Sequence, residues 1–141
     1  MRRPPGTLEV TVVPRTAVAQ QQTPAGWAVL DAARVTIRVE RLQSAVLPVV
    51  TIPAGSPGSA RAYAAAVSAV RALAGTTPDV VAVRASSADD VVLTLRSGLR
   101  VRWGGEEDAT AKTEALHAAL RRAARGATEI DVSSPGVVLT R

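Results

Sequence analysis

The chain has 141 residues, enough for one domain, and 47% of them are hydrophobic, which excludes a disordered polar chain. It contains no cysteine, so disulfides, thiolate zinc sites and a cysteine nucleophile are excluded. The formal net charge is +5, and the 17 basic residues include a single lysine, Lys112. Ala, Val and Arg are abundant and Phe and Lys are scarce, a bias that indicates a GC-rich gene first and a functional requirement only second.

Alternating polar and apolar residues predict short strands in the first third of the chain. The expected strands are residues 7–13, 17–20, 27–30, 34–40 and 46–52. Turns are expected at 21–26 and 31–33, where polar residues, Pro or small residues interrupt the pattern. Val35, Ile37 and Val39 fall on one face of the fourth strand, which predicts that this face is buried.

Two helices are predicted from apolar residues at a spacing of 3.6. The first covers 59–74, with Ser59 as the expected N-cap and Gly75 as the expected stop. The second covers 108–124 and ends before Gly126. The apolar stripe of the first helix is Tyr63, Ala66, Val67, Val70 and Leu73, and that of the second is Leu116, Ala119, Leu120 and Ala123.

The rest of the chain predicts strands at 80–84, 91–95, 99–103, 128–132 and 137–140. Ser97 and Gly98 form a two-residue hairpin turn between two of them. Because strands outnumber helices and the hairpins are short, we expect an α+β fold with a mostly antiparallel sheet and two helices. No repeat or long linker divides the chain, so residues 1–141 are expected to form a single domain.

The positive charge permits a basic adaptor that binds nucleic acid or acidic surfaces, and this remains the alternative function. The densest groups are Arg96, Arg100 and Arg102, and then Arg121, Arg122 and Arg125. The second group suits the C-terminal end of a helix, so ordinary helix electrostatics account for it. Three aromatic residues, Trp27, Tyr63 and Trp103, offer few platforms for stacking bases.

Membrane, export and catalytic signals are weak in this sequence. No apolar run reaches the length of a membrane span, and residues 1–14 do not form the core of a signal peptide.

Catalysis by a small hydrolase would depend on His117, the only histidine, which has only Glu114 nearby on its helix. The pair Gly104 and Gly105 lacks the spacing of a phosphate-binding loop. Two acidic pairs, Asp89–Asp90 and Glu106–Glu107, are candidate metal ligands. The alternative is that these carboxylates cap a helix or face solvent.

The last predicted strand, 137–140, points to a binding function instead. A short apolar strand at a chain end tends to lie at the edge of a sheet, where it closes the sheet or pairs with the strand of a partner. The scarcity of convergent titratable groups favours binding over catalysis.

Three segments carry a resemblance to a known family. The first is RPPGTLEVTVVPRTAVA at 3–19, followed by WAVLD at 27–31. The second is LTLRSGLRVRWG at 93–104, which continues to Lys112 and Leu116, and the third is IDVSSPG at 130–136. In order and spacing they resemble the extracytoplasmic β domain of the bacterial division proteins FtsQ and DivIB.

The sequence also departs from that family. Arg34 stands where the family has Gly, Pro14 replaces a Glu, and 39–44 has no counterpart. Residues 1–13 resemble the strand that joins the POTRA domain to the β domain. The family's transmembrane helix and POTRA domain are not in this sequence, so we expect the natural gene to begin upstream.

The resemblance implies a non-enzymatic scaffold of the divisome, at the extracytoplasmic face of the cell membrane, in septum formation and the regulation of peptidoglycan synthesis. It implies FtsB and FtsL as partners, bound by β-augmentation, and no cofactor, metal or catalytic residue. The partner-binding residues that it implies are Ser134, Gly136, Val137, Val138, Leu139 and Thr140.

Overall fold

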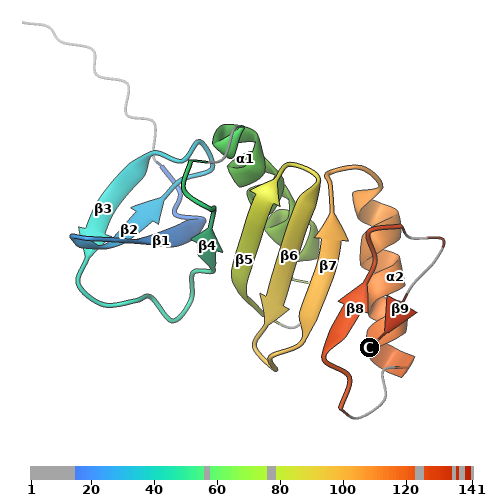
Figure 1. Ribbon diagram of the computed structural model, residues 1–141. Coiled ribbons are helices and arrows are strands. Elements are labelled where there is room, and N and C mark those ends of the chain that lie inside the picture. The colour runs from blue at the N-terminus through green and yellow to red at the C-terminus, as the bar shows by residue number, and fades with distance from the viewer. Residues whose placement is uncertain are drawn as a thin grey trace, which may run out of the picture.

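The computed structural model describes residues 15–55, 58–75, 79–122, 126–134, 136 and 139–140. The predicted strand at 7–13 and its resemblance to a junction strand therefore lie outside the described residues. In chain order the elements are β1 Ala19–Thr23, β2 Gly26–Leu30, β3 Thr36–Glu40, β4 Val49–Thr51, α1 Ser59–Leu73, β5 Val80–Ser87, β6 Asp90–Leu95, β7 Arg100–Gly104, α2 Ala109–Arg122, β8 Glu129–Asp131 and β9 Leu139–Thr140 (Figure 1).

The nine strands form one sheet in the order β3-β2-β1-β4-β5-β6-β7-β8-β9. The predicted α+β class with two helices is confirmed, but the sheet is mixed rather than purely antiparallel. The pairs β1–β4, β4–β5 and β7–β8 are parallel, and the other pairs are antiparallel. Two of the parallel pairs arise because α1 and α2 connect β4 to β5 and β7 to β8, and a helical crossover returns the chain in the same direction.

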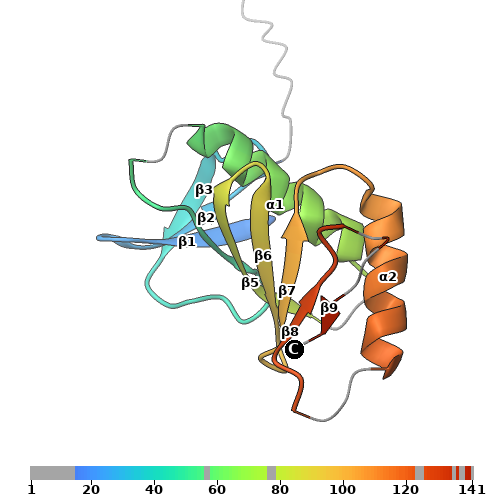
Figure 2. The same cartoon turned by 45° about the vertical axis from the view of Figure 1, so that its right-hand side comes forward.

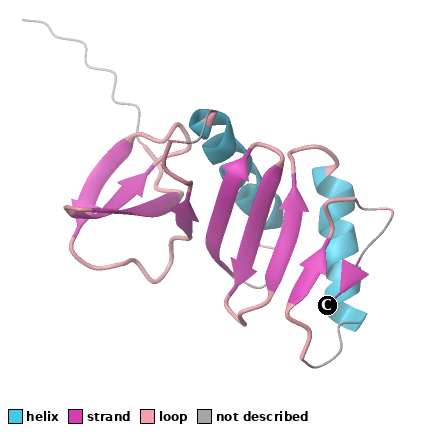
Figure 3. Cartoon of the chain, viewed as in Figure 1, coloured by secondary structure: helices cyan, strands magenta, loops and turns pink. Residues whose placement is uncertain are grey.

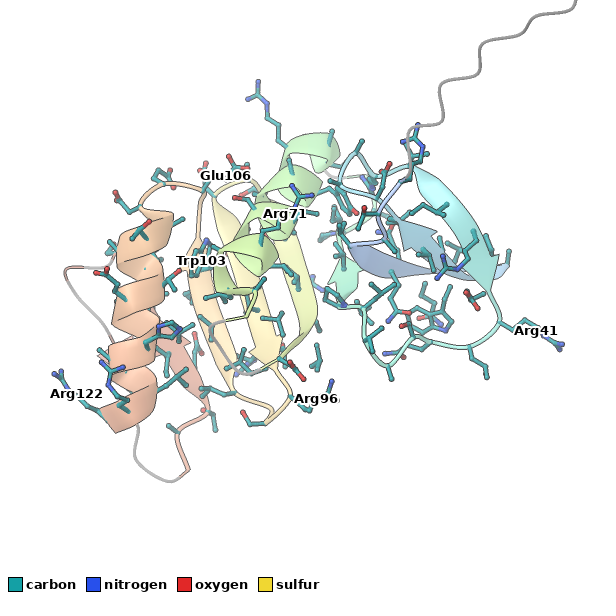
Figure 4. The ribbon with its side chains drawn as sticks, turned by 180° about the vertical axis from the view of Figure 1, so that it is seen from behind. Arg41, Arg71, Arg96, Trp103, Glu106 and Arg122 are labelled. Carbon is teal, nitrogen blue, oxygen red and sulfur yellow. The ribbon has the colours of Figure 1, made fainter. Side chains whose placement is uncertain are left out.

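Both helices lie on one face of the sheet, as the front and turned views show (Figures 2 and 3). The core fills the space between the helices and the sheet, and its largest fully buried side chain is that of Trp103. Seen from behind, Trp103 lies between α1 and α2, while Glu106 and Arg122 mark opposite ends of α2 (Figure 4). Neither of the described helices lies on the opposite face of β5, β6 and β7 (Figures 1 and 2).

The start of α1 differs from the sequence prediction. Ser59 is the first helical residue rather than the N-cap, which is Gly58 at φ 73°. Among the described residues, no side chain caps this end of the helix. Only a glycine adopts this left-handed conformation without strain, so the backbone, not a hydroxyl, sets the start of α1. Gly75, at φ 74°, follows the helix as predicted.

β1, β2 and β3 form a three-stranded unit that joins the rest of the sheet at a narrow point. Between β1 and β4 the register contains one pair, Gln20 with Val49. The buried Gln20 side chain strengthens this junction: its Nε2 donates to the carbonyl oxygens of Ser44 and Leu47, at 2.8 and 2.7 Å. Its Oε1 accepts from the Ser44 amide at 2.8 Å. Gln20 therefore holds the loop between β3 and β4 against the sheet.

Asp31 organises the turn between β2 and β3. Its Oδ1 accepts from the backbone amides of Ala33 and Val35. Its backbone carbonyl accepts the Tyr63 hydroxyl at 2.7 Å. Arg34 in this turn has a φ of 66°, the left-handed conformation that favours glycine. This conformation explains why the resembling family has Gly at that position.

Candidate functional site

The C-terminal edge of the sheet is built from β8 and β9. β8 runs parallel to β7, and buried Ile130 anchors it in the core. β9 pairs antiparallel with β8, with Thr140 opposite Ile130 and Leu139 opposite Asp131. Because β9 is the last strand of the sheet, it has a strand neighbour on one side only among the described residues. This edge is the feature that a partner strand requires.

The connection between β8 and β9 begins with a side-chain turn. Asp131 Oδ1 accepts from the Ser133 amide at 3.0 Å and from the Ser133 hydroxyl at 2.6 Å. The Val132 amide donates to the Arg102 carbonyl and extends the ladder by one residue. Gly104 packs beside this turn, since a Cβ atom added to it would lie 3.0 Å from the Cβ of Ser133. The end of β7 thus fixes the point at which the chain leaves β8.

The structure places the predicted partner-binding residues as follows. Ser134 and Gly136 are exposed in the connection, Thr140 is exposed on β9, and Leu139 is the other residue of β9. Val137 and Val138 lie outside the described residues. The predicted last strand is therefore confirmed over Leu139–Thr140, beside β8 as its neighbour.

The helix-free face beside this edge is hollowed and rich in arginine. The hollow has a volume of about 390 Å³ and is lined by Thr51, Ala82, Val83, Arg84, Ser86, Asp90, Val92, Thr94, Arg100, Arg102 and Glu129. Glu129 Oε1 accepts from Arg102 Nε at 3.2 Å, and its Oε2 lies 4.0 Å from Arg100 Nη2. The hydrogen bond to Glu129 raises the pKa of the Arg102 guanidinium, so this cation persists. Spacing marked Arg100 and Arg102 as part of a basic group, but only the sheet brings Arg84 and Glu129 beside them.

The turn at Gly104 and Gly105, whose spacing did not fit a phosphate-binding loop, is held by a lysine side chain. Lys112 is only 2% exposed, and its Nζ donates to the Gly105 carbonyl at 2.8 Å. The same ammonium lies 5.6 Å from the centre of the Trp103 ring and 3.9 Å from Glu107 Oε2. Lys112 thus secures the connection from β7 to α2. In the sequence, Lys112 stood out only as the single lysine and as part of the family pattern.

The other candidate groups do not converge. His117 is half-buried on α2, and Asp89 lies in the tight turn between β5 and β6. Asp90 accepts a hydrogen bond from the Ser86 hydroxyl. Among the described residues, no three His, Asp or Glu side chains gather into a metal-binding group. In the same part of the chain, neither helix has the length and hydropathy to cross a membrane.

Two open ends on one sheet, with helices on one face, define an architecture suited to contact with other proteins. The chain matches the family described as cell division protein FtsQ/DivIB, C-terminal, over residues 17–133. It therefore belongs to the FtsQ/DivIB family of bacterial division proteins, a family of membrane-associated, non-enzymatic proteins of the division site. No curated protein matches the chain.

Proposed function

We propose that residues 1–141 form an FtsQ-type β domain that scaffolds the divisome at the extracytoplasmic face of the septum. In this proposal FtsB and FtsL are the partners, and a segment of FtsB adds as a strand to β9. The observation that carries the proposal is the position of β9, which pairs with β8 and ends the sheet. Main-chain hydrogen bonds would supply the affinity, and alternate side chains would set the register.

The hollow beside this edge supports the same proposal. Arg100 and Arg102 lie on β7, next to β8, so a segment that leaves β9 would pass over cationic side chains. Glu129 already pairs with both, and Arg84 forms no ion pair with any described residue. Acidic side chains in the partner would therefore find a complementary surface.

A proline scan of residues 138, 139 and 140 tests the proposal. Successive amides of a strand point alternately toward the neighbour and toward the free edge. A proline at an outward amide should weaken binding of an FtsB-derived peptide and leave the stability unchanged, whereas proline at an inward amide should destabilise β9. The matched controls keep the amide: Val138→Thr, Leu139→Ile and Thr140→Val. Unchanged peptide binding by all three proline variants would contradict the proposal.

The basic-adaptor alternative has less support from the fold. Trp103 and Tyr63 are buried, and Trp27 is half-buried, so the three aromatic side chains offer little exposed ring surface. Stacking on single strands needs more such surfaces. A DNA titration at several salt concentrations separates the two functions, because nucleic-acid binding would weaken steeply as salt rises. Salt-dependent DNA binding without peptide binding would favour the adaptor.

A further inference from the structure

In the part of the chain that the structure describes, the sheet has a second open end at β3, opposite β9 in the strand order (Figure 1). The sequence predicted that Val35, Ile37 and Val39 form a buried face, but Val35 is 40% and Val39 is 52% exposed. A register shift opposite Val29 and Leu30 interrupts the alternation of this strand. β3 is thus an edge strand with uncovered apolar side chains, and pairing with another strand would cover part of them.

The backbone of Val39 faces this open edge. A Cβ atom placed on Gly26 of β2 would lie 2.5 Å from the Glu40 carbonyl oxygen, so this carbonyl points toward β2. Amide and carbonyl groups of successive strand residues point to opposite sides. The N–H and C=O of Val39 therefore point away from β2 and can pair with a further strand.

The charges on β3 limit which strand can pair there. Arg38 and Glu40 lie on the same face of the strand, with Arg38 Nε 2.6 Å from Glu40 Oε1, and both are exposed. Charged side chains on an edge disfavour pairing with most other strands. Here the two charges have opposite sign and flank Val39 symmetrically, so the edge is complementary to itself.

We propose that β3 pairs antiparallel with β3 of a second copy of this chain, about a twofold axis at Val39. In that register Val39 lies opposite Val39 of the second copy. Arg38 then lies opposite Glu40 of the second copy, and the reverse pair forms by symmetry. An axis at Arg38 or at Glu40 would instead place like charges directly opposite, which is unfavourable. Charge therefore selects both the occupant and the register.

Such an association leaves β9 free, because β9 lies at the other end of the sheet. A twofold axis perpendicular to the sheet also keeps the helices of both copies on the same side. β3 has only five residues, so the contact is small and the association is weak in dilute solution.

A disulfide trap tests the register, because the native chain has no cysteine. Residues directly opposite in a hydrogen-bonded antiparallel pair have Cα atoms about 5.5 Å apart, within the range of a disulfide. Val39→Cys should yield a disulfide-linked dimer under mild oxidation. Val35→Cys, on the same chain segment but far from the axis, is the matched control and should stay monomeric. No dimer from Val39→Cys, or equal dimer from both variants, would overturn the proposal.

Charge reversal tests the partner without any disulfide. Arg38→Glu and Glu40→Arg should each weaken self-association, measured by sedimentation equilibrium up to millimolar concentration, by at least roughly ten-fold. An equimolar mixture of the two variants should recover it, because the heterodimer restores both opposite-charge pairs. If the mixture associates no more strongly than each single variant alone, the proposed register is wrong. If circular dichroism shows that either variant does not fold, the comparison of Val39→Cys with Val35→Cys tests the proposal instead.

Discussion

The guanidinium carbon of Arg34 lies 5.5 Å from the centre of the Tyr63 ring. Arg34 belongs to the turn before β3, and Tyr63 belongs to α1, so this contact joins the three-stranded unit to the helical layer. The Tyr63 hydroxyl strengthens the junction, since it donates to the Asp31 carbonyl of the same turn. The cation–π contact offsets part of the strain of a left-handed arginine.

Substitution of Arg34 separates these two effects. Arg34→Ala keeps the left-handed backbone and loses the ring contact, so the free energy of unfolding should fall by about 1 kcal/mol. Arg34→Gly loses the same contact but removes the backbone strain, and should be more stable than Arg34→Ala by about 1 kcal/mol. Urea unfolding of the three proteins measures both differences. An alanine variant as stable as the glycine variant would show that the strain is absent.

Tyr63 should titrate at an unusually high pH. Burial, together with the Asp31 carboxylate, raises the pKa of Tyr63 from 10.0 to about 12. Because the folded state favours the protonated phenol, this contribution to stability is complete below pH 10.0 and is lost as the pH rises through about 12. Tyr63 is the only tyrosine, so tyrosinate absorbance reports it alone. We expect a midpoint near 12 in the folded protein and near 10.0 in urea; equal midpoints would contradict burial of the hydroxyl.

Acid should weaken the turn before β3. The hydrogen bond from the Val35 amide and then that from Arg15 lower the pKa of Asp31 below 3.8. Asp31 therefore contributes stability above pH 3.8, and this contribution is lost as the pH falls through its folded-state pKa. Asp31→Asn should be less stable at neutral pH and should flatten the acid side of the stability curve. Thermal unfolding between neutral and acidic pH measures this, and an unchanged acid slope in the variant would assign the effect to other carboxylates.

Gly104→Ala should destabilise the protein more than Gly126→Ala. Both glycines have left-handed backbones, at φ 85° and 89°, so each substitution carries about 1 kcal/mol of strain. A Cβ on Gly104 also meets Ser133 at 3.0 Å, whereas a Cβ on Gly126 meets no atom of the described residues within 4 Å. The difference in the free energy of unfolding isolates the contact with Ser133. Gly104→Ala should also weaken peptide binding at β9, because the turn after β8 must shift. Equal stability of the two variants would show that Ser133 moves aside without a cost in free energy.

Lys112→Met should lower the free energy of unfolding by about 1–3 kcal/mol, because the buried Gly105 carbonyl loses its donor. A second readout uses the same side chain, since Lys112 is the only lysine. Amine-reactive reagents should modify it slowly in the folded protein and quickly in urea, as mass spectrometry of its peptide would show. Fast labelling of the folded protein would contradict its burial.

The sequence predicted the elements because helix and strand periodicities are local signals. Tyr63 and Leu73 marked the buried stripe of α1, and Gly98 marked the hairpin between β6 and β7. The parallel pairing of β4 with β5 was missed, because it depends on the route of α1 across the sheet. The family resemblance identified the C-terminal edge as the candidate site, and alternation alone left its role open.

Other features could not be predicted because they depend on contacts between distant residues. Lys112 and Gln20 are polar, so no hydrophobic pattern predicts their burial. Each side chain is buried where it donates hydrogen bonds to backbone carbonyl groups of another segment. The arginine-rich hollow combines residues from five strands. Val39 is exposed although its pairing partner Ala28 is buried, because β3 is the last strand at its end of the described sheet, and periodicity does not reveal strand order.

The single pair between β1 and β4 determines how the protein would respond to mechanical load. Interstrand hydrogen bonds lie perpendicular to the strands, so tension between β3 and β9 would pull along these bonds and open one ladder at a time. The ladder at Gln20 and Val49 contains one residue pair and is the shortest in the sheet that the structure describes, since even the contact of β9 with β8 contains two. Under such tension the unit β1–β3 would part from the sheet once the contacts of Tyr63 with Asp31 and Arg34 also break, while β5, β6 and β7 stay packed against the helices. The junction at Gln20 would then act as a mechanical release between the two ends of the molecule.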